Sequence, residues 1–180
     1  MLPDSAGSAA TAGGGADINA VHFANADEGI AVCDGDLIIK TVDGGEHWTA
    51  CTGNTGTANV VLSAVCFTRN HFLVGTTLDA TGSLWASFDG GDTWVRQRFT
   101  GDNAEDVTSL SFYGSHFGYM VTNTAGPVGS IHRSIDGGHT WQELDPPTNS
   151  GFNAILACGY NDAKLVGKVN AATAFIGSVG

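Results

Sequence analysis

Apolar and polar residues alternate in short segments along the chain, and no segment shows a helical period. A period of two is typical of strands with one buried face. Glycine, asparagine and aspartate interrupt the segments about every ten residues, which indicates tight turns. The pattern therefore predicts an all-β protein made of many short strands, with alternating apolar pairs such as Val21 and Phe23, Val65 and Phe67, and Leu110 and Phe112.

Two sequence markers recur with the same period. The octapeptides TVDGGEHW, SFDGGDTW and SIDGGHTW begin at residues 41, 87 and 134, so their tryptophans are 46 and 47 residues apart. A second block reads INAVHF, LSAVCF, VTSLSF and FNAILA, with starts at 18, 62, 107 and 152 that are 44, 45 and 45 residues apart. Two independent markers that stay in phase indicate four copies of one structural repeat.

Each of the first three repeats contains four strand-like segments. In the first repeat these are residues 18–24, 28–33, 36–42 and 47–52; the equivalents are 62–68, 71–78, 82–88 and 93–99, then 107–113, 117–123, 129–135 and 140–145. Four short antiparallel strands per repeat of about 45 residues are typical of a propeller blade. We therefore expect a β-propeller of four four-stranded blades (18–61, 62–106, 107–151 and 152–180), preceded by a Gly/Ala/Ser-rich leader over residues 1–17.

The fourth repeat differs because it supplies only three strands. FNAILACGY, AKLVGKV and AATAFIGSVG are the strand segments, and Gly180 stands where Asp43 stands in the first repeat. The last blade is thus expected to lack its outer strand, and an open sheet edge promotes aggregation. We expect main-chain pairing with this edge either by the leader, within residues 3–14, or by another chain.

The octapeptide resembles the Asp-box, or bacterial neuraminidase (BNR) repeat, of sialidases, sortilin-type receptors and photosystem II stability/assembly-factor-like proteins. The likeness rests on three octapeptides and, through the first-strand block, extends over residues 18–180. The resemblance implies a β-propeller with each box on the turn between the third and fourth strands of a blade, away from the ligand face. Among these families the chain resembles the assembly-factor-like proteins.

Elementary chemistry predicts a structural role for the box. The carboxylate accepts backbone N–H groups inside the turn, glycine permits backbone angles that other residues resist, and the tryptophan ring folds beneath the turn. We expect no catalytic residue, no metal ligand and no cofactor here. The expected structural residues are Asp43, Gly45 and Trp48, Asp89, Gly91 and Trp94, and Asp136, Gly138 and Trp141.

Charge and cysteine content narrow the choice of partners. Seven lysines and arginines against eighteen aspartates and glutamates give a net charge of −11, which disfavours nucleic acid and anionic membrane surfaces. No apolar run reaches the roughly 18 residues of a membrane span, and the N-terminus does not read as a secretory signal. The four cysteines form no CxxC pair, so free thiols are expected.

The sequence gives little support to an enzymatic activity. The sialidase resemblance implies an arginine triad, a Tyr–Glu pair and an acid aspartate, but this chain has only four arginines and no suitable Tyr–Glu spacing. HExxH, GxSxG and Walker A motifs are absent, and the six histidines lack ligand spacing. The acidic group Asp102, Glu105 and Asp106 reads as a solvated loop rather than a Ca²⁺ site. We expect a protein that is not an enzyme.

The leading hypothesis is a non-enzymatic protein–protein interaction or structural assembly module that binds other protein subunits. A component of a large particle such as a phage virion is one form of this hypothesis. The alternatives are a carbohydrate-binding propeller and an assembly factor for a membrane complex. Any ligand is expected at the face formed by the blade-to-blade loops (52–61, 100–106 and 146–151) and the second-to-third-strand loops (34–36, 79–82 and 124–128).

Overall fold

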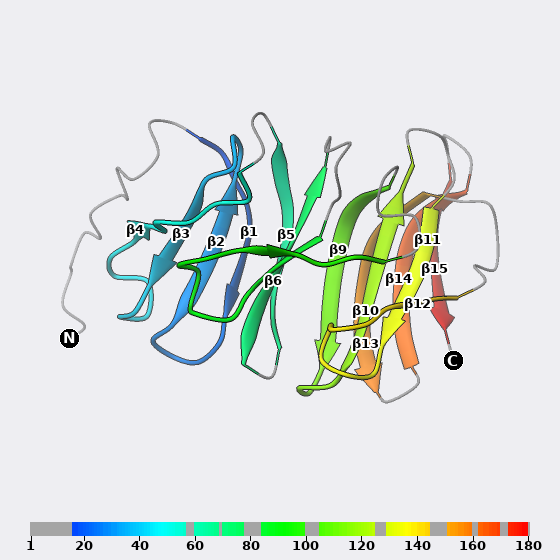
Figure 1. Cartoon of the computed structure of the whole chain (residues 1–180). Helices are drawn as coiled ribbons and strands as arrows, with labels where there is room; N and C mark the ends of the chain where they lie inside the picture. The colour runs from blue at the N-terminus through cyan, green and yellow to red at the C-terminus, as the bar shows by residue number, and fades with distance from the viewer. Residues whose placement is uncertain are drawn as a thin grey trace, which may run out of the picture.

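The alternating pattern folds into sheets that stand side by side in a row (Figure 1). The computed structural model describes residues 16–56, 60–68, 70–77, 84–99, 105–124, 129–144, 151–159, 162–169 and 173–179. Every regular element within these ranges is a β-strand. None of them is a helix long and apolar enough to cross a membrane.

Each sheet is antiparallel, and its strands follow one another in chain order. The first blade contains β1 (Ile18–Phe23), β2 (Gly29–Cys33), β3 (Ile38–Thr41) and β4 (Thr49–Ala50). The second contains β5 (Val61–Thr68), β6 (His71–Thr77), β7 (Leu84–Ser87) and β8 (Val95–Arg96). The third contains β9 (Asp106–Tyr113), β10 (Phe117–Asn123), β11 (Gly129–Ser134) and β12 (Gln142–Leu144). The fourth contains β13 (Gly151–Gly159), β14 (Asp162–Val169) and β15 (Thr173–Val179).

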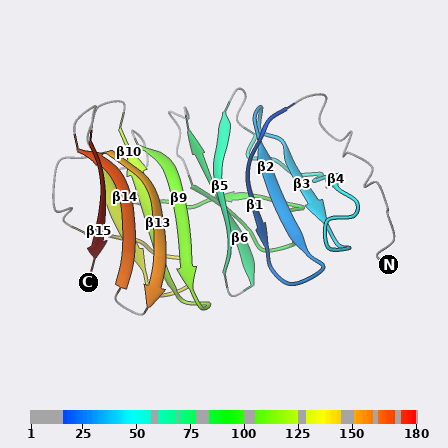
Figure 2. The ribbon, with the colours of Figure 1, turned by 180° about the vertical axis from the view of Figure 1, so that it is seen from behind.

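The predicted β-propeller architecture is confirmed, with three blades of four strands and a fourth that shows three. The innermost strands β1, β5, β9 and β13 are neighbours in that order. The first and fourth sheets lie at opposite ends of the row in both views, so the described blades form an open arc (Figures 1 and 2). Residues 1–15 lie outside the described part of the chain, and closure by the leader stays a prediction.

The outer strands are shorter than the sequence pattern predicts. Expected segments 47–52, 93–99 and 140–145 contain pairing over only two or three residues each, in β4, β8 and β12. Each of these strands begins just after the tryptophan of an octapeptide, and in the first and third blades the indole of that tryptophan donates to the turn. Trp48 Nε1 lies 3.1 Å from the Gly45 carbonyl, and the chain rejoins the sheet only after this residue.

A β-bulge occurs near the start of the innermost strand in all four blades. The pairing shifts between Ile18 and Ala20, between Leu62 and Ala64, and between Phe152 and Ala154, and β9 shows the same shift opposite β10. One extra residue brings the first and the fourth residue of each block to the same face of the sheet. Leu62 and Val65, for example, are both buried on the side of the preceding blade.

The hydrophobic core consists of separate layers between neighbouring blades. The first residue of the repeated first-strand block is fully buried in the second, third and fourth blades, where it is Leu62, Val107 and Phe152. Each packs onto the middle strands of the blade before it, where apolar residues of β2 and β3, β6 and β7, or β10 and β11 receive it. Burying these side chains contributes roughly 1.5–3 kcal/mol each to stability.

Candidate functional site

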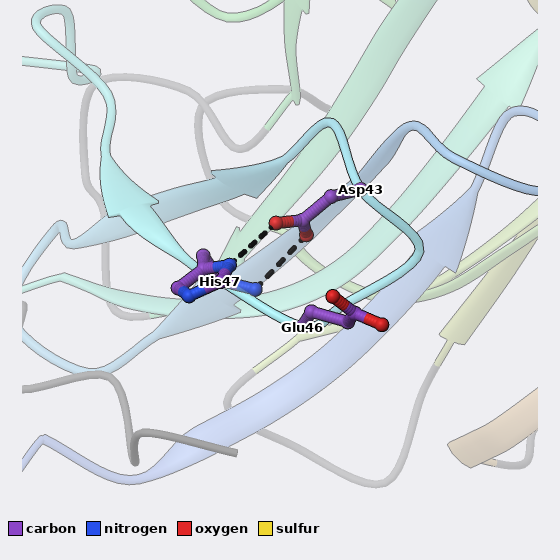
Figure 3. Close-up of side chains that lie close together, drawn as sticks. All are labelled: Asp43, Glu46 and His47. Carbon is purple, nitrogen blue, oxygen red and sulfur yellow. Dashed lines mark hydrogen bonds and ion pairs between the residues drawn. The ribbon is translucent and has the colours of Figure 1, made fainter. Parts of the chain in front are cut away.

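The first Asp-box turn directs its polar groups into itself. Asp43 Oδ1 accepts the Thr41 hydroxyl at 2.8 Å and the His47 backbone N–H at 2.9 Å. Asp43 Oδ2 lies 2.7 Å from His47 Nδ1, as Figure 3 shows. Hydrogen bonds from the His47 backbone and ring, and from Thr41, lower the pKa of Asp43 to about 2.

The second and third turns repeat this geometry with a threonine in place of His47. Asp89 accepts the Thr93 N–H at 2.8 Å and its hydroxyl at 2.5 Å, and Asp136 accepts the same groups of Thr140 at 2.9 and 2.6 Å. The hydrogen bonds from Thr93 lower the pKa of Asp89 to about 2. Burial alone would raise the pKa of Asp136, but its hydrogen bonds outweigh this and lower it.

The second glycine of each box is required by the backbone. Gly45, Gly91 and Gly138 have φ angles of 94°, 95° and 92°, a region that side-chain-bearing residues rarely adopt. Their N–H groups donate to the hydroxyl that opens the box, at 2.9, 2.7 and 2.8 Å. The aspartate and the opening hydroxyl of each box therefore find partners inside their own turn. In the second box, Asp92 instead pairs with Lys40 of the first blade at 2.8 Å, and Trp94 Nε1 is buried without a hydrogen-bond partner among the described residues.

One group near the first box has the ligand types of a metal site. One ligand atom each of Asp43, Glu46 and His47 lies within 4.8 Å of the others, and no second group of this kind occurs among the described residues. Figure 3 shows that Asp43 and His47 face each other, with Glu46 beside them. Both oxygens of Asp43 already accept hydrogen bonds of the turn, and the expected absence of a metal ligand stays a prediction.

The edge of the blades opposite the Asp boxes holds carboxylates in a different way. In the first blade, Asp36 is 6% exposed and has a φ of 63°. Its carboxylate accepts the Thr55 N–H at 3.0 Å, the Thr55 hydroxyl at 2.6 Å and the Gly56 N–H at 3.0 Å. One aspartate thus fixes the start of the connection to the second blade.

In the third blade, Glu105 occupies a buried polar pocket of the same edge. Its carboxylate accepts the Ser130 hydroxyl at 3.1 Å and the Thr122 hydroxyl, and lies 3.6 Å from His132 Nε2. The side chain of His132 is fully buried and that of Glu105 is 13% exposed. Burial alone would raise the pKa of Glu105, but hydrogen bonds from His132, Thr122 and Ser130 outweigh burial and lower it.

The expectation of a solvated acidic loop is therefore wrong for Glu105. Ser130 lies 25 residues away on β11, and no spacing in the sequence signals that its hydroxyl meets this carboxylate. The same hydroxyl also lies 3.1 Å from Glu143 Oε1, and Glu143 itself is exposed. Asp102 lies outside the described residues. This edge thus presents a surface glutamate above a buried one.

Sequence reasoning also missed a ring cluster between the second and third boxes. The His71 ring lies 4.6 Å from Phe88 and 5.1 Å from His139, and Phe88 stacks on His139 at 5.7 Å. Burial, followed by the charge of His139, lowers the pKa of His71 to about 4.

All four cysteines are free thiols, as expected.

The open arc of sheets and its three self-contained turns define an Asp-box β-propeller. Over residues 15–149 the chain matches the model of the family described as photosynthesis system II assembly factor YCF48. The match spans most of the chain, and the chain belongs to this family. No curated protein matches it.

Solved structures with the same fold include two of YCF48. YCF48 bound to D1 peptide is 19% identical with a TM-score of 0.65, and the match covers 88% of this chain and 52% of that one. YCF48 from Cyanidioschyzon merolae is 19% identical with a TM-score of 0.58, over 92% of this chain and 57% of that one. A GH74 enzyme from Niastella koreensis is 16% identical with a TM-score of 0.66, over 79% and 23%. The chain thus spans about half the length of the YCF48 structures.

The family match changes the order of the functional hypotheses. It favours the assembly-factor alternative over the leading hypothesis of a structural module, and nothing in the comparisons supports a phage virion component. A YCF48 structure that holds a D1 peptide supports the expectation of protein partners. GH74 structures show the same fold in enzymes, so the absence of enzymatic activity stays a prediction.

Proposed function

We propose that this chain is an assembly factor that binds an extra-membrane peptide segment of a photosystem-type membrane complex. The observation that carries the proposal is the match to the YCF48 family over residues 15–149. The solved structure of YCF48 bound to D1 peptide supports a peptide as the kind of ligand. Binding of such a peptide segment requires a rigid recognition surface and no catalytic group.

The proposed binding surface is the edge opposite the Asp boxes. The three box aspartates accept hydrogen bonds inside their own turns, and the three turns repeat one geometry. The opposite edge differs from blade to blade, with Asp36 in the first and Glu105 and Glu143 in the third. Recognition of one particular segment needs such individual positions, and loops on a rigid scaffold commonly provide them.

The charge of this edge favours a partner segment that contains lysine or arginine. Glu143 is exposed and lies at the same Ser130 hydroxyl as the partly buried Glu105, and the whole chain carries a net charge of −11. A cationic segment gains from long-range attraction during encounter and from an ion pair at Glu143 on arrival. An acidic segment is repelled by both.

A titration with labelled D1 peptides tests the proposal. One peptide retains its lysines and arginines, and in a second they are replaced by glutamine. We expect binding of the first, weaker binding of the second, and a loss of about tenfold in affinity for Glu143→Lys, equal to ~1.4 kcal/mol. The matched control is Glu28→Lys, which makes the same change at an exposed residue of the β1–β2 connection, near the Asp-box edge.

Two results would contradict the proposal. The first is a chain that binds neither peptide although it is folded. The second is equal weakening by Glu143→Lys and Glu28→Lys, which would place the peptide elsewhere or reduce its binding to nonspecific charge attraction.

A further inference from the structure

The first blade presents a face that is covered in every other blade. Ile18 is 63% exposed, whereas its repeat equivalents Leu62, Val107 and Phe152 are fully buried against a preceding blade. Val21 is 53% exposed, whereas its equivalents are at most 9% exposed. The free face also includes Phe23, which is 40% exposed. These three residues form an apolar junction face without a blade on it among the described residues.

A hydrogen bond accompanies each of the three internal junctions. The residue that follows the buried position donates from its side chain to the backbone carbonyl of the buried residue in the next blade. Asn19 donates to Leu62 at 3.0 Å, Ser63 donates to Val107, and Thr108 donates to Phe152 at 3.1 Å. In the fourth blade the same position is Asn153, which is exposed.

A third contact joins each blade to the Asp box of the next. Ile30 on β2 packs against Gly91, the second glycine of the following box, and Leu73 on β6 packs in the same way against Gly138. In the fourth blade, strand register places Lys164 at the position of Ile30 and Leu73. Each of these three residues pairs with the fifth residue of its first-strand block, which is His22, Cys66 or Leu156. Lys164 is exposed, and so is Leu156 at 60%.

The face that would receive Lys164 is acidic. By repeat equivalence the receiving glycine in the first blade is Gly45, and the exposed Glu46 follows it directly. Among the described residues, Lys164 Nζ donates to Asp162 of the same blade, at 2.9 Å to Oδ1 and 3.2 Å to Oδ2. The two free ends of the arc thus carry exposed apolar residues at both ends, a side-chain donor at the repeat position of Asn19, and a lysine and a glutamate of opposite charge.

We propose that the fourth blade docks on the first blade of a second copy, and that two copies close a ring of eight blades through two identical junctions. Leu156 then covers Ile18 and Val21, Asn153 donates to the Ile18 carbonyl, and Lys164 pairs with Glu46. The free faces lie at opposite ends of the arc, as a ring of two copies requires (Figures 1 and 2).

Repeat equivalence and charge support a second copy as the occupant, because Lys164 of one free end and Glu46 of the other stand at positions that meet across a junction. In the first three blades, the face towards the next blade covers Leu62, Val107 or Phe152 of that next blade. Among the described blades, only the fourth has this face free.

Native mass spectrometry and light scattering across a dilution series test the proposal. We expect a species of twice the 18.4 kDa of one chain, which dissociates on dilution. Lys164→Glu and Glu46→Lys should each shift the equilibrium to monomer by at least tenfold, and the double variant should restore the dimer. Both residues are exposed, so circular dichroism should show each single variant folded.

Ile18→Asp provides an independent test of the apolar part of the junction. It should abolish the dimer, whereas Val42→Asp should leave it intact, because Val42 is 70% exposed but lies in an Asp-box turn outside both faces. A folded chain that stays monomeric at high micromolar concentration overturns the proposal. A dimer that neither Ile18→Asp nor the charge reversals weaken overturns it as well.

Discussion

The two edges of the blades hold their carboxylates in opposite ways. At the Asp-box edge, Asp89 meets partners that lie at most four residues away in the chain. At the opposite edge, Glu105 meets hydroxyls 17 and 25 residues away, and Asp36 meets Thr55 and Gly56, 19 and 20 residues away. Local contacts make each turn an independent unit, whereas distant contacts tie different strands and loops together.

This difference between local and distant contacts indicates which edge of the blades contributes more to stability and to recognition of a partner. A turn whose aspartate is satisfied locally can be repeated in each blade, since that carboxylate needs no partner from another blade. A carboxylate that joins distant segments must differ from blade to blade, and it fixes the loops around it. We therefore expect the opposite edge to be both more sensitive to substitution and more specific to this chain.

The largest effect is expected from Glu105→Ala. Removal of this carboxylate leaves Thr122, Ser130 and the buried His132 without their shared acceptor. We expect a loss of about 3 kcal/mol in the free energy of unfolding, measured by urea denaturation. Glu143→Ala at the exposed neighbour is the control and should change stability by less than about 0.5 kcal/mol. Equal small effects of the two substitutions would remove the distinction between the edges.

A smaller effect is expected from Asp136→Ala in the third box. The variant loses the acceptor of the Ser134 hydroxyl and of the Thr140 N–H and hydroxyl, which we expect to lower stability by about 1–2 kcal/mol. Asp136→Asn keeps one acceptor oxygen, so its free energy of unfolding should lie between those of the unchanged chain and of Asp136→Ala. Binding of a D1 peptide by the folded variant should equal that of the unchanged chain. Lost binding at full stability would show that the box does more than lock a turn.

The smallest effect concerns the pH dependence of stability between the second and third boxes. The pKa of His71 is lowered to about 4 in the folded protein, so the unfolded chain binds the proton more readily. Stability should therefore fall as the pH drops from about 6.5 towards 4, since the unfolded state then binds more protons. His71→Phe should flatten melting temperature against pH over this window. An unchanged slope would mean that other groups set the dependence.

The fold was predictable to a large extent, because its signals are local and repeated. The octapeptides specify turns whose hydrogen bonds are made within the same eight residues, such as Asp136 to Thr140. The first-strand block, repeated in four copies, gave the inner strands and the blade count. The shortness of the outer strands was not predictable, because no local signal marks where the chain rejoins the sheet after each box.

The opposite edge was largely hidden from sequence reasoning. Glu105 reads as part of an acidic loop until β10 and β11 bring Thr122 and Ser130 to it. The position of Lys164 likewise follows only from strand register. The bulges in β13 shift its pairing with β14, so the partner of a residue cannot be found by counting along the sequence. Contacts between distant segments depend on the folded arrangement, and no spacing in the chain announces them.

Hydrogen–deuterium exchange with and without a bound D1 peptide tests the central claim most directly. The account predicts slower exchange at the edge opposite the Asp boxes, in backbone amides near Asp36, Glu105 and Ser130. Exchange in the three Asp-box turns should stay the same. Slower exchange confined to the Asp-box turns, or no change at either edge with peptide in saturating excess, would contradict it.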